Sequence, residues 1–203
     1  MIEVIQMQAA LVGDIDADAD LTKIEAMART CYDSPMSTTK DERNAFIAKL
    51  VKAGHHSVLE HVSVSVMLTV PRSISHQIVR HRVGVAYSQQ SQRYVDLSKR
   101  PLQVIAPIPP LEGTAFDIWY RTTETSASAY DVLIQGGARP QQARAVLPNC
   151  AATKIGMTAN LRAWSYIFCE RWKNPAADPA MREIMGMVWD ILAPLYPPVF
   201  SDH

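Results

Sequence analysis

In the stretch Val62-Ser63-Val64-Ser65-Val66-Met67-Leu68-Thr69-Val70, apolar side chains occupy every second position. Neighbouring side chains of a β-strand point to opposite faces, so this period of two predicts a half-buried strand. One polar face also favours an antiparallel sheet, because parallel sheets are usually covered on both faces. Pro71 has no amide hydrogen to donate to a neighbouring strand, and we expect the strand to end there.

Two helices are predicted ahead of this strand. The acidic run at residues 14–20 precedes apolar residues with helical spacing, which predicts a helix over residues 21–30. Thr39 and Glu42 match the pattern of a capping box, in which each side chain bonds a main-chain amide at the helix start. This second helix is expected to end at Gly54, since glycine is common just beyond helix ends.

A further helix is predicted directly after the strand. Ile74 and Ile78 lie four residues apart and would share one helical face. Gln77, Arg80 and His81 would share another face, which would direct all three side chains into one pocket.

The rest of the chain combines a polar loop with helical segments. Residues 87–93 are predicted to form a loop whose amides could cradle an anion. Further helices are expected over residues 114–136 and 140–148, after an N-cap at Asn160, and around residues 184–191. Because no linker, repeat or low-complexity tract interrupts the pattern, we predict one α+β domain over residues 1–203.

The composition allows a sizeable buried core and excludes a broad basic face. The chain has 203 residues, of which 48% are hydrophobic. Its 20 Lys and Arg residues balance 20 Asp and Glu residues, so the formal net charge is zero. Duplex nucleic acid is therefore not an expected partner.

The cysteines and the apolar segments favour a reducing cytoplasm. Cys31, Cys150 and Cys169 are widely separated and odd in number, which argues against a disulfide framework or a zinc ribbon. The first residues lack the basic and apolar regions of a signal peptide, and no apolar stretch approaches the length that spans a membrane. We expect a cytoplasmic protein without a membrane partner.

The triplet Arg80-His81-Arg82 and the polar run Tyr87-Ser88-Gln89-Gln90-Ser91-Gln92-Arg93-Tyr94 have the chemistry of an anion site. Arginine grips phosphate with two parallel hydrogen bonds, and histidine changes charge near neutral pH. There is no Gly-x-Gly-x-x-Gly motif and no Walker loop, so a Rossmann site or a phosphate-loop NTPase is not indicated. A small polyanion bound on another fold fits the residues better.

This triplet, followed at short range by Ser91 and Arg93, resembles the signature of the flavin-dependent thymidylate synthases. The spacing from the triplet to the serine is one residue longer here than is usual in that family. Further segments carry the resemblance over roughly residues 25 to 192: Gly54-His55-x-Ser57-x-x-Glu60-His61, Gln77, Ala143-Arg144-Ala145-Val146-Leu147-Pro148, Asn160-Leu161-Arg162 and Arg171.

The resemblance implies the thymidylate synthase-complementing protein fold, a central antiparallel sheet flanked by helices. It implies transfer of a one-carbon unit from 5,10-methylenetetrahydrofolate to uracil C5 of dUMP, with reduced FAD as hydride source and NADPH regenerating the flavin. It also implies a homotetramer with active sites shared between subunits. A relative in nucleoside-antibiotic biosynthesis methylates both UMP and dUMP, and this is the alternative, because the longer loop could admit a 2′-hydroxyl.

Carried over position by position, the resemblance assigns Arg171 to the catalytic role of holding the uracil ring and stabilising its charge. The remaining substrate-binding residues implied are Gln77, Arg80, Gln89, Gln90, Ser91, Gln92, Arg93 and Arg144. The cofactor-binding residues implied are His55, Ser57, Arg80, His81, Arg82, Gln89, Asn160, Arg162 and Tyr166. None of the cysteines lies beside the arginine cluster, which favours flavin chemistry over a thiol nucleophile.

Other classes of function use the same residues. A single-stranded nucleic-acid binder could use arginines with Tyr87 and Tyr94 as cations and stacking platforms, although the neutral charge balance disfavours it. A metal-dependent hydrolase could use His55, Glu60 and His61, although this spacing differs from the helical zinc pattern. Each arginine taken alone is more often a solvated charge than a ligand-binding residue.

Overall fold

The alternating stretch folds as strand β3 (Ser63–Pro71), as predicted, in a computed structural model that describes residues 1–200. The apolar side chains from Val64 to Val70 on one face are at most 1% exposed. On the opposite face, Ser63 and Met67 are exposed. Burial of one face supplies the hydrophobic free energy that holds a period-two segment in a sheet.

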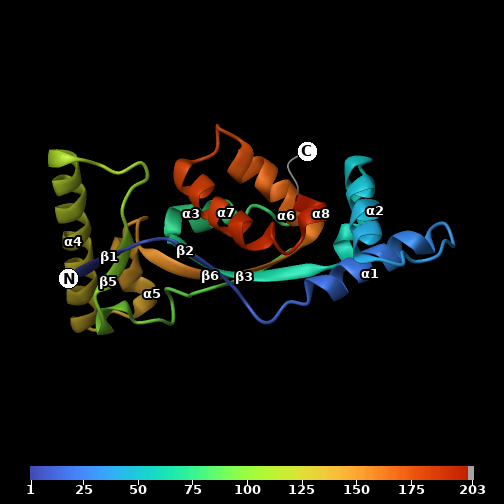
Figure 1. The fold of residues 1–203 in the computed structure, drawn as a ribbon. Helices are drawn as coiled ribbons and strands as arrows, with labels where there is room; N and C mark the ends of the chain where they lie inside the picture. The colour runs from blue at the N-terminus through green and yellow to red at the C-terminus, as the bar shows by residue number, and fades with distance from the viewer. Residues whose placement is uncertain (201–203) are drawn as a thin grey trace. The chain divides into compact units, whose positions relative to one another are not determined.

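β3 lies inside a four-stranded sheet of order β2-β3-β6-β4, of which Figure 1 labels β2, β3 and β6. Its companions are β2 (Gln8–Leu11), β4 (Val85–Gln89) and β6 (Ala152–Asn160). In β6, Thr153, Ile155, Met157 and Ala159 are buried at every second position. This strand was not predicted from the sequence, although it has the same period of two.

Main-chain hydrogen bonds fix the strand directions. Leu161 donates to Val62 and Arg72 donates to Ala151, which makes β3 and β6 antiparallel. Asn160 donates to Gly84 and Gln90 donates to Lys154, which makes β6 and β4 antiparallel in the same way. The predicted fold class, an α+β chain whose central antiparallel sheet is flanked by helices, is confirmed.

A second sheet was not predicted. It consists of β1 (Ile2–Ile5) and β5 (Leu102–Ile105), which pair in parallel with Ile2 opposite Leu102. These strands are too short for a periodic signal to stand out, since each has only four residues.

The α-helices flank these sheets, and short 3-10 turns join several of them. The α-helices are α1 (Ala17–Thr30), α2 (Lys40–Lys52), α3 (Arg72–Ile78), α4 (Gly113–Gln135), α5 (Pro140–Ala143), α6 (Leu161–Phe168), α7 (Pro179–Leu192) and α8 (Pro197–Phe200). The 3-10 turns are η1 (His56–His61), η2 (Leu97–Lys99) and η3 (Arg144–Val146), and η4 (Cys169–Lys173) is a π-helical turn.

The chain forms two compact units. Unit 1 comprises Met1–Gln8, Leu68–Arg80 and Ser88–Gly156, and unit 2 comprises Ala9–Met67, His81–Tyr87 and the chain from Met157 onward. The single domain expected over residues 1–203 stays a prediction, and residues 201–203 lie outside the part that the structure describes.

Unit 1 has its own small hydrophobic core. Leu102 and Val104 of β5 pack with Ala127 of α4 and with Ala151, and the partly buried Trp119 of α4 lies against them. The long helix α4 thereby covers the parallel β1-β5 pair (Figure 1).

Unit 2 is built around aromatic side chains. Trp164 of α6 is fully buried, and its indole Nε1 donates to the carbonyl of Val64 at 3.3 Å. Its ring stacks on Phe168 with centroids 5.7 Å apart, and Phe168 meets Phe200 of α8 edge-on at 5.4 Å. These contacts join α6 to the strand and to the last described helix.

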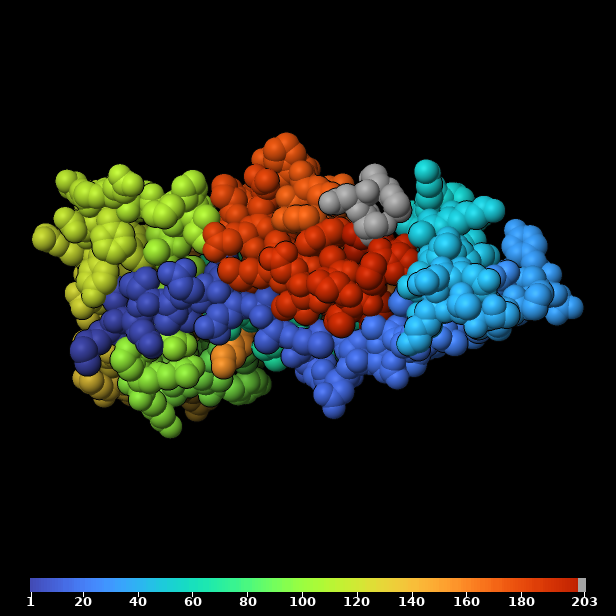
Figure 2. Space-filling view, in the orientation of Figure 1, coloured from blue at the N-terminus to red at the C-terminus, as the bar shows by residue number. Residues whose placement is uncertain are grey.

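Helix α2 of unit 2 begins at the cap that the sequence predicts, whereas α1 begins at Ala17, ahead of the predicted start at residue 21. The Thr39 hydroxyl accepts from the Glu42 amide at 3.2 Å, and the Glu42 carboxylate accepts from the Thr39 amide at 3.2 Å. Asp16 caps α1 by accepting from the Ala19 amide at 3.0 Å. Arg43 joins the two helices through Asp18 at 2.9 Å, and their atoms pack together in Figure 2 (blue and cyan).

Two predictions near the triplet are wrong. The helix after β3 ends at Ile78, so it carries neither Arg80 nor His81; the Arg80 amide bonds the Gln77 carbonyl in a tighter turn. Residues 87–89 belong to strand β4 and not to a loop. Pairing with β6 outweighs the polar composition of this segment, in which Ser88 is exposed.

Within residues 1–200, no helix combines the length and apolarity that crossing a membrane requires.

Candidate functional site

Unit 1 brings two arginines together beside the polar loop. Arg72 opens α3, and its Nη1 donates to the carbonyl of Gln90 at 3.4 Å. Burial and the positive charge of Arg144 both lower the pKa of Arg72. None of the ion pairs among residues 1–200 includes either arginine. Two neighbouring cations without a carboxylate suit a doubly charged anion such as a phosphate monoester.

Sequence reasoning predicted Arg144 but missed Arg72. The signal available was its position, directly after the strand-ending Pro71 and at the first turn of the following helix. The position of Arg72 could not predict that Arg144 lies near it, because the two residues are far apart in the chain and only the fold brings them together.

The polar loop uses two of its own amides. The Gln90 amide donates to Lys154 of β6 at 2.9 Å, and the Arg93 amide donates to the Ser91 hydroxyl at 3.1 Å. The expected anion cradle of loop amides is therefore wrong for these two residues. Gln92 is partly exposed, and the Arg93 guanidinium is exposed and lies over the Tyr94 ring at 5.4 Å.

Gln89 links three elements of unit 1. Its Nε2 donates to the Ser75 hydroxyl of α3 at 2.8 Å and to the Thr153 hydroxyl of β6 at 3.4 Å. Ser75 is fully buried and donates in turn to the Arg72 carbonyl at 2.8 Å. Because both amide hydrogens point at hydroxyls, the Gln89 carbonyl oxygen is the atom left for a ligand.

Gln77 lies partly buried near the end of α3, and Arg80 is exposed two residues beyond that helix. These two predicted substrate ligands share unit 1 with Gln89 and Arg144.

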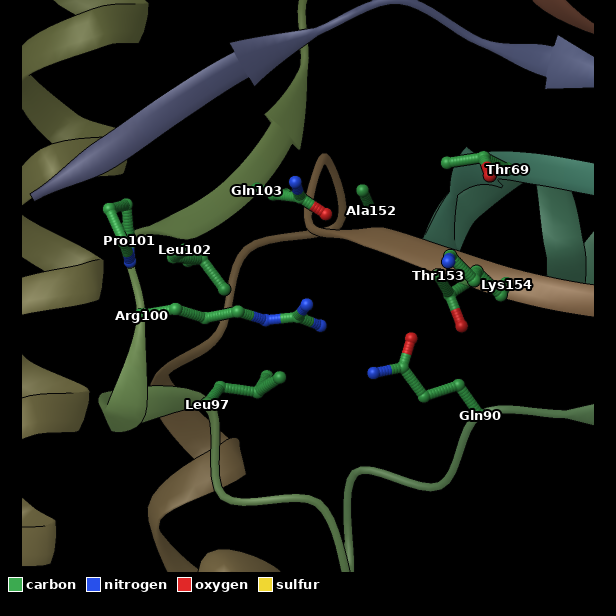
Figure 3. Close-up of a pocket in the computed structure, with 10 residues that line it drawn as sticks. All are labelled: Thr69, Gln90, Leu97, Arg100, Pro101, Leu102, Gln103, Ala152, Thr153 and Lys154. Carbon is green, nitrogen blue, oxygen red and sulfur yellow. The ribbon is translucent and has the colours of Figure 1, made fainter.

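A hollow opens behind the loop, as Figure 3 shows. Arg100 extends into it toward Gln90 and Thr153 from the opposite wall. No acidic residue lines the hollow, and Gln90 is the one lining residue that belongs to the predicted site. The lining residues are Thr69, Gln90, Leu97, Arg100, Pro101, Leu102, Gln103, Ala152, Thr153 and Lys154.

In unit 2, Arg171 is bonded to the histidine of the triplet. Arg171 lies in the π-helical turn that follows α6, and its Nε donates to His81 Nε2 at 2.9 Å. Such turns are rare and frequently occur at functional sites. Tyr166 is 61% exposed and meets the His81 ring edge-on, with centroids 6.0 Å apart.

The predicted flavin contacts from η1 and α6 also lie in unit 2. Arg162 is paired with Glu60, which joins the start of α6 to η1. His55 and Ser57 at the start of η1 are exposed, as is Arg82. The set offers a hydroxyl, an imidazole and guanidinium groups, which are the donors that a pyrophosphate-bearing flavin requires.

Asn160 caps a helix and packs against a glycine. Its Oδ1 accepts from the Ala163 amide at 2.8 Å and caps α6, as the sequence predicts. Its amide group lies against Gly84, which has a φ of +70°. A Cβ atom built at Gly84 would be 2.5 Å from Asn160 Nδ2, so only glycine fits this approach.

We expect Gly84→Ala to destabilise the protein more than Gly13→Ala. Gly13 also has a positive φ, of +81°, but a Cβ there would meet no atom within 4 Å. The left-handed backbone should cost about 1 kcal/mol at either position. The collision with Asn160 should raise the loss at Gly84 to roughly 2 kcal/mol or more. Equilibrium unfolding in urea measures both losses, and equal values would contradict the close approach.

The metal-site alternative gains no support from the geometry. Among residues 1–200, no three His, Cys, Asp or Glu side chains are placed to hold a metal ion. Glu60 is paired with Arg162, and the ring Nε2 of His56 lies 3.1 Å from the carbonyl of Val51.

Comparison with known proteins places the chain in one family. A family model described as "Thymidylate synthase complementing protein" matches residues 15–198. A flavin-dependent thymidylate synthase of Mycolicibacterium gilvum (strain PYR-GCK) is 35% identical over 207 residues, which cover 92% of this chain and 81% of the relative. The protein of the same name from Mycobacterium tuberculosis (strain ATCC 25618 / H37Rv) is 34% identical over 208 residues, with the same coverage.

A solved structure has the same fold. The UMP/dUMP methylase PolB from Streptomyces cacaoi, bound with 5-Br dUMP, superposes with a TM-score of 0.80 at 19% identity. The match covers 98% of this chain and 94% of that chain. The chain belongs to the thymidylate synthase-complementing protein family, whose flavin-dependent thymidylate synthases it resembles in sequence.

Proposed function

We propose that this enzyme methylates uracil C5 of a uridine monophosphate, converting dUMP to dTMP. The observation that carries the proposal is the approach of Arg72 and Arg144 beside the loop at Gln90. A phosphate dianion would relieve the repulsion between these guanidiniums and accept charge-assisted hydrogen bonds from both. We assign Ser91, Gln92 and Arg93 to the same phosphate end.

The uracil ring is assigned to Arg171. Carbon 5 of uracil becomes nucleophilic only when electron density moves onto the ring, and a guanidinium at N3 and the carbonyl oxygens stabilises that charge. The methylene carbon of the folate would bond to C5, and the C5 proton would leave. The bond from that carbon to the folate nitrogen would break and release tetrahydrofolate, and a hydride would complete the methyl group. Gln77 and Arg80 are assigned to the ring edge, and the Gln89 carbonyl oxygen to a sugar hydroxyl.

We assign the flavin, as FAD, to residues of unit 2. Bound reduced flavin supplies the hydride, and NADPH restores the reduced form. Ser57, Arg82 and Arg162 provide donors to the cofactor, and His55, Tyr166 and the Asn160 amide group lie on the same unit. Arg162 would exchange its exposed pairing with Glu60 for a cofactor phosphate at small cost, because exposed ion pairs contribute little.

UMP is the second candidate substrate. PolB, which has the same fold, is a UMP/dUMP methylase, and the loop before Ser91 is one residue longer here than is usual. Turnover of UMP and dUMP compared under equal conditions decides between them. A strong preference for dUMP would dismiss the ribonucleotide.

We extend the proposal to 5,10-methylenetetrahydrofolate as carbon donor, to a homotetramer with shared active sites, and to the cytoplasm. The first two follow family membership, and the third follows the unpaired cysteines. Light scattering of the purified protein would test the tetramer directly.

Purified protein tests the function as a whole. We expect it to be yellow, to release FAD on denaturation, and to form dTMP from dUMP with methylenetetrahydrofolate and NADPH. Omission of NADPH should stop multiple turnovers. Salt-sensitive binding of oligonucleotides without any uridylate methylation would instead favour a single-stranded nucleic-acid binder.

A further inference from the structure

The bond between Arg171 and His81 fixes the charge and the tautomer of the histidine. A guanidinium Nε–H can only donate, so His81 Nε2 at 2.9 Å must accept. A neutral imidazole has one acceptor nitrogen, which places its proton on Nδ1. An imidazolium ring has no acceptor and could not make this bond.

The ring is held in place on two sides. The Tyr87 hydroxyl of β4 donates to the His81 carbonyl at 2.6 Å and anchors the main chain. Tyr166 of α6 meets the ring edge-on at an interplanar angle of 69°. The acceptor nitrogen therefore faces Arg171 from a fixed position, while Arg171 projects from a π-helical turn.

The charges around His81 favour its neutral form. Burial lowers its pKa most, the Arg171 guanidinium lowers it further, and Glu170 beside Arg171 opposes them. Tyr87 and Tyr166 also contact His81, and Arg80 and Arg82 flank it in the chain. Burial raises the pKa of Tyr87 to about 12. Tyr87 therefore adds no negative charge that would favour the imidazolium near neutral pH.

We propose that His81 is a positioning residue whose neutral, Nδ1-protonated ring orients the Arg171 guanidinium for the uracil ring, and that protonation of His81 releases it. The bond to His81 uses the Nε–H of Arg171 and leaves the two terminal amino groups for a ligand. Protonation removes the acceptor and sets two cations side by side, so Arg171 turns away. The inference rests on the proposed function, because it assigns the uracil ring to Arg171.

Affinity for dUMP measured by calorimetry from pH 5 to pH 8 tests the proposal. Because the pKa of His81 is lowered, the affinity of the wild-type protein should fall only at a pH below the ordinary histidine value of about 6.5. His81→Gln supplies an amide oxygen that accepts the same bond but does not titrate. The affinity of wild type relative to His81→Gln should therefore be near one at pH 8 and should fall roughly tenfold by pH 5, about 1.4 kcal/mol.

Two controls test whether the His81 imidazole causes the pH dependence of dUMP affinity. The phosphate of dUMP also titrates near pH 6, but its effect is common to both proteins and cancels in their ratio. His76→Gln replaces an exposed histidine of α3 and should keep the wild-type pH profile. His81→Ala removes the acceptor and should bind dUMP more weakly than His81→Gln at every pH.

Nitrogen NMR of the histidine rings gives a readout that needs no folded His81 variant. At pH 8 the wild-type His81 should show protonated Nδ1 and bare Nε2, and Arg171→Gln should populate the other tautomer. Matching pH profiles for wild type and His81→Gln, or a bare Nδ1 in the wild type, would overturn this inference alone. A wild-type protein that binds no dUMP at pH 8 would overturn the proposed function with it.

Discussion

Arg171→Gln is expected to lower kcat for dUMP methylation by about 100-fold or more. The guanidinium is assigned to the charge that develops on the uracil ring, and removing one preorganised donor at such a charge typically costs that much. KM should change less, because the interaction is strongest in the transition state. Arg171→Lys keeps the charge without the planar fork, so its loss should be intermediate.

Steady-state rates of dTMP formation measure these losses, with flavin content determined for every variant. Arg121→Gln is the matched control, since Arg121 is exposed on α4 and has no assigned role. Arg121→Gln should retain the wild-type rate. An Arg171→Gln protein that binds flavin and turns over within threefold of wild type would contradict the catalytic assignment.

Arg72→Gln and Arg144→Gln should each weaken dUMP binding by roughly 10-fold to 100-fold. Hydrogen bonds to charged groups contribute about 1.5–3 kcal/mol, and each 1.4 kcal/mol is a factor of ten in affinity. Arg144→Gln should also make the free protein slightly more stable, because it removes one of two cations that repel each other.

Binding of deoxyuridine, which lacks the phosphate, shows whether the two arginines contact the phosphate or the rest of the nucleotide. Its affinity should be the same for wild type and both variants, since it has no phosphate to lose. The double variant also tests whether the arginines share one anion, in which case the two losses would not add. Equal losses for dUMP and deoxyuridine would show that the substitutions disturb the fold and not a phosphate contact.

Local sequence signals predicted the elements whose causes are local. The alternation from Val62 to Val70, the capping box at Thr39 and the cap at Asn160 each depend on residues close in the chain, and all three are present. Such features form wherever propensity and burial agree.

Elements that depend on pairing were missed. Strand β4 exposes Ala86 and Ser88 on its outer face, and its place is fixed by bonds to β6 at Asn160 and Lys154. The helix after β3 continues in the periodic pattern to Arg80, but the chain leaves it at Ile78 to enter that strand. A short stretch of sequence does not show which strand it will pair with.

In the candidate site too, local motifs predicted some residues, whereas contacts between distant residues required the fold. Resemblance identified Arg144 and Arg171 by motif. The effect of Arg144 on the pKa of Arg72 and the hydrogen bond between Arg171 and His81 appeared only in the fold. His81 was predicted as a cofactor ligand, and its bond to Arg171 could not be read from residues so far apart in sequence.

Release of tritium from [5-³H]dUMP tests the central claim most directly, because methylation at C5 must expel the hydrogen there. With flavin-loaded protein, methylenetetrahydrofolate and NADPH, we predict tritium release matched by an equal amount of dTMP, and neither product when the folate is left out. Flavin-loaded protein that binds dUMP or UMP yet releases no tritium from either nucleotide would contradict the account.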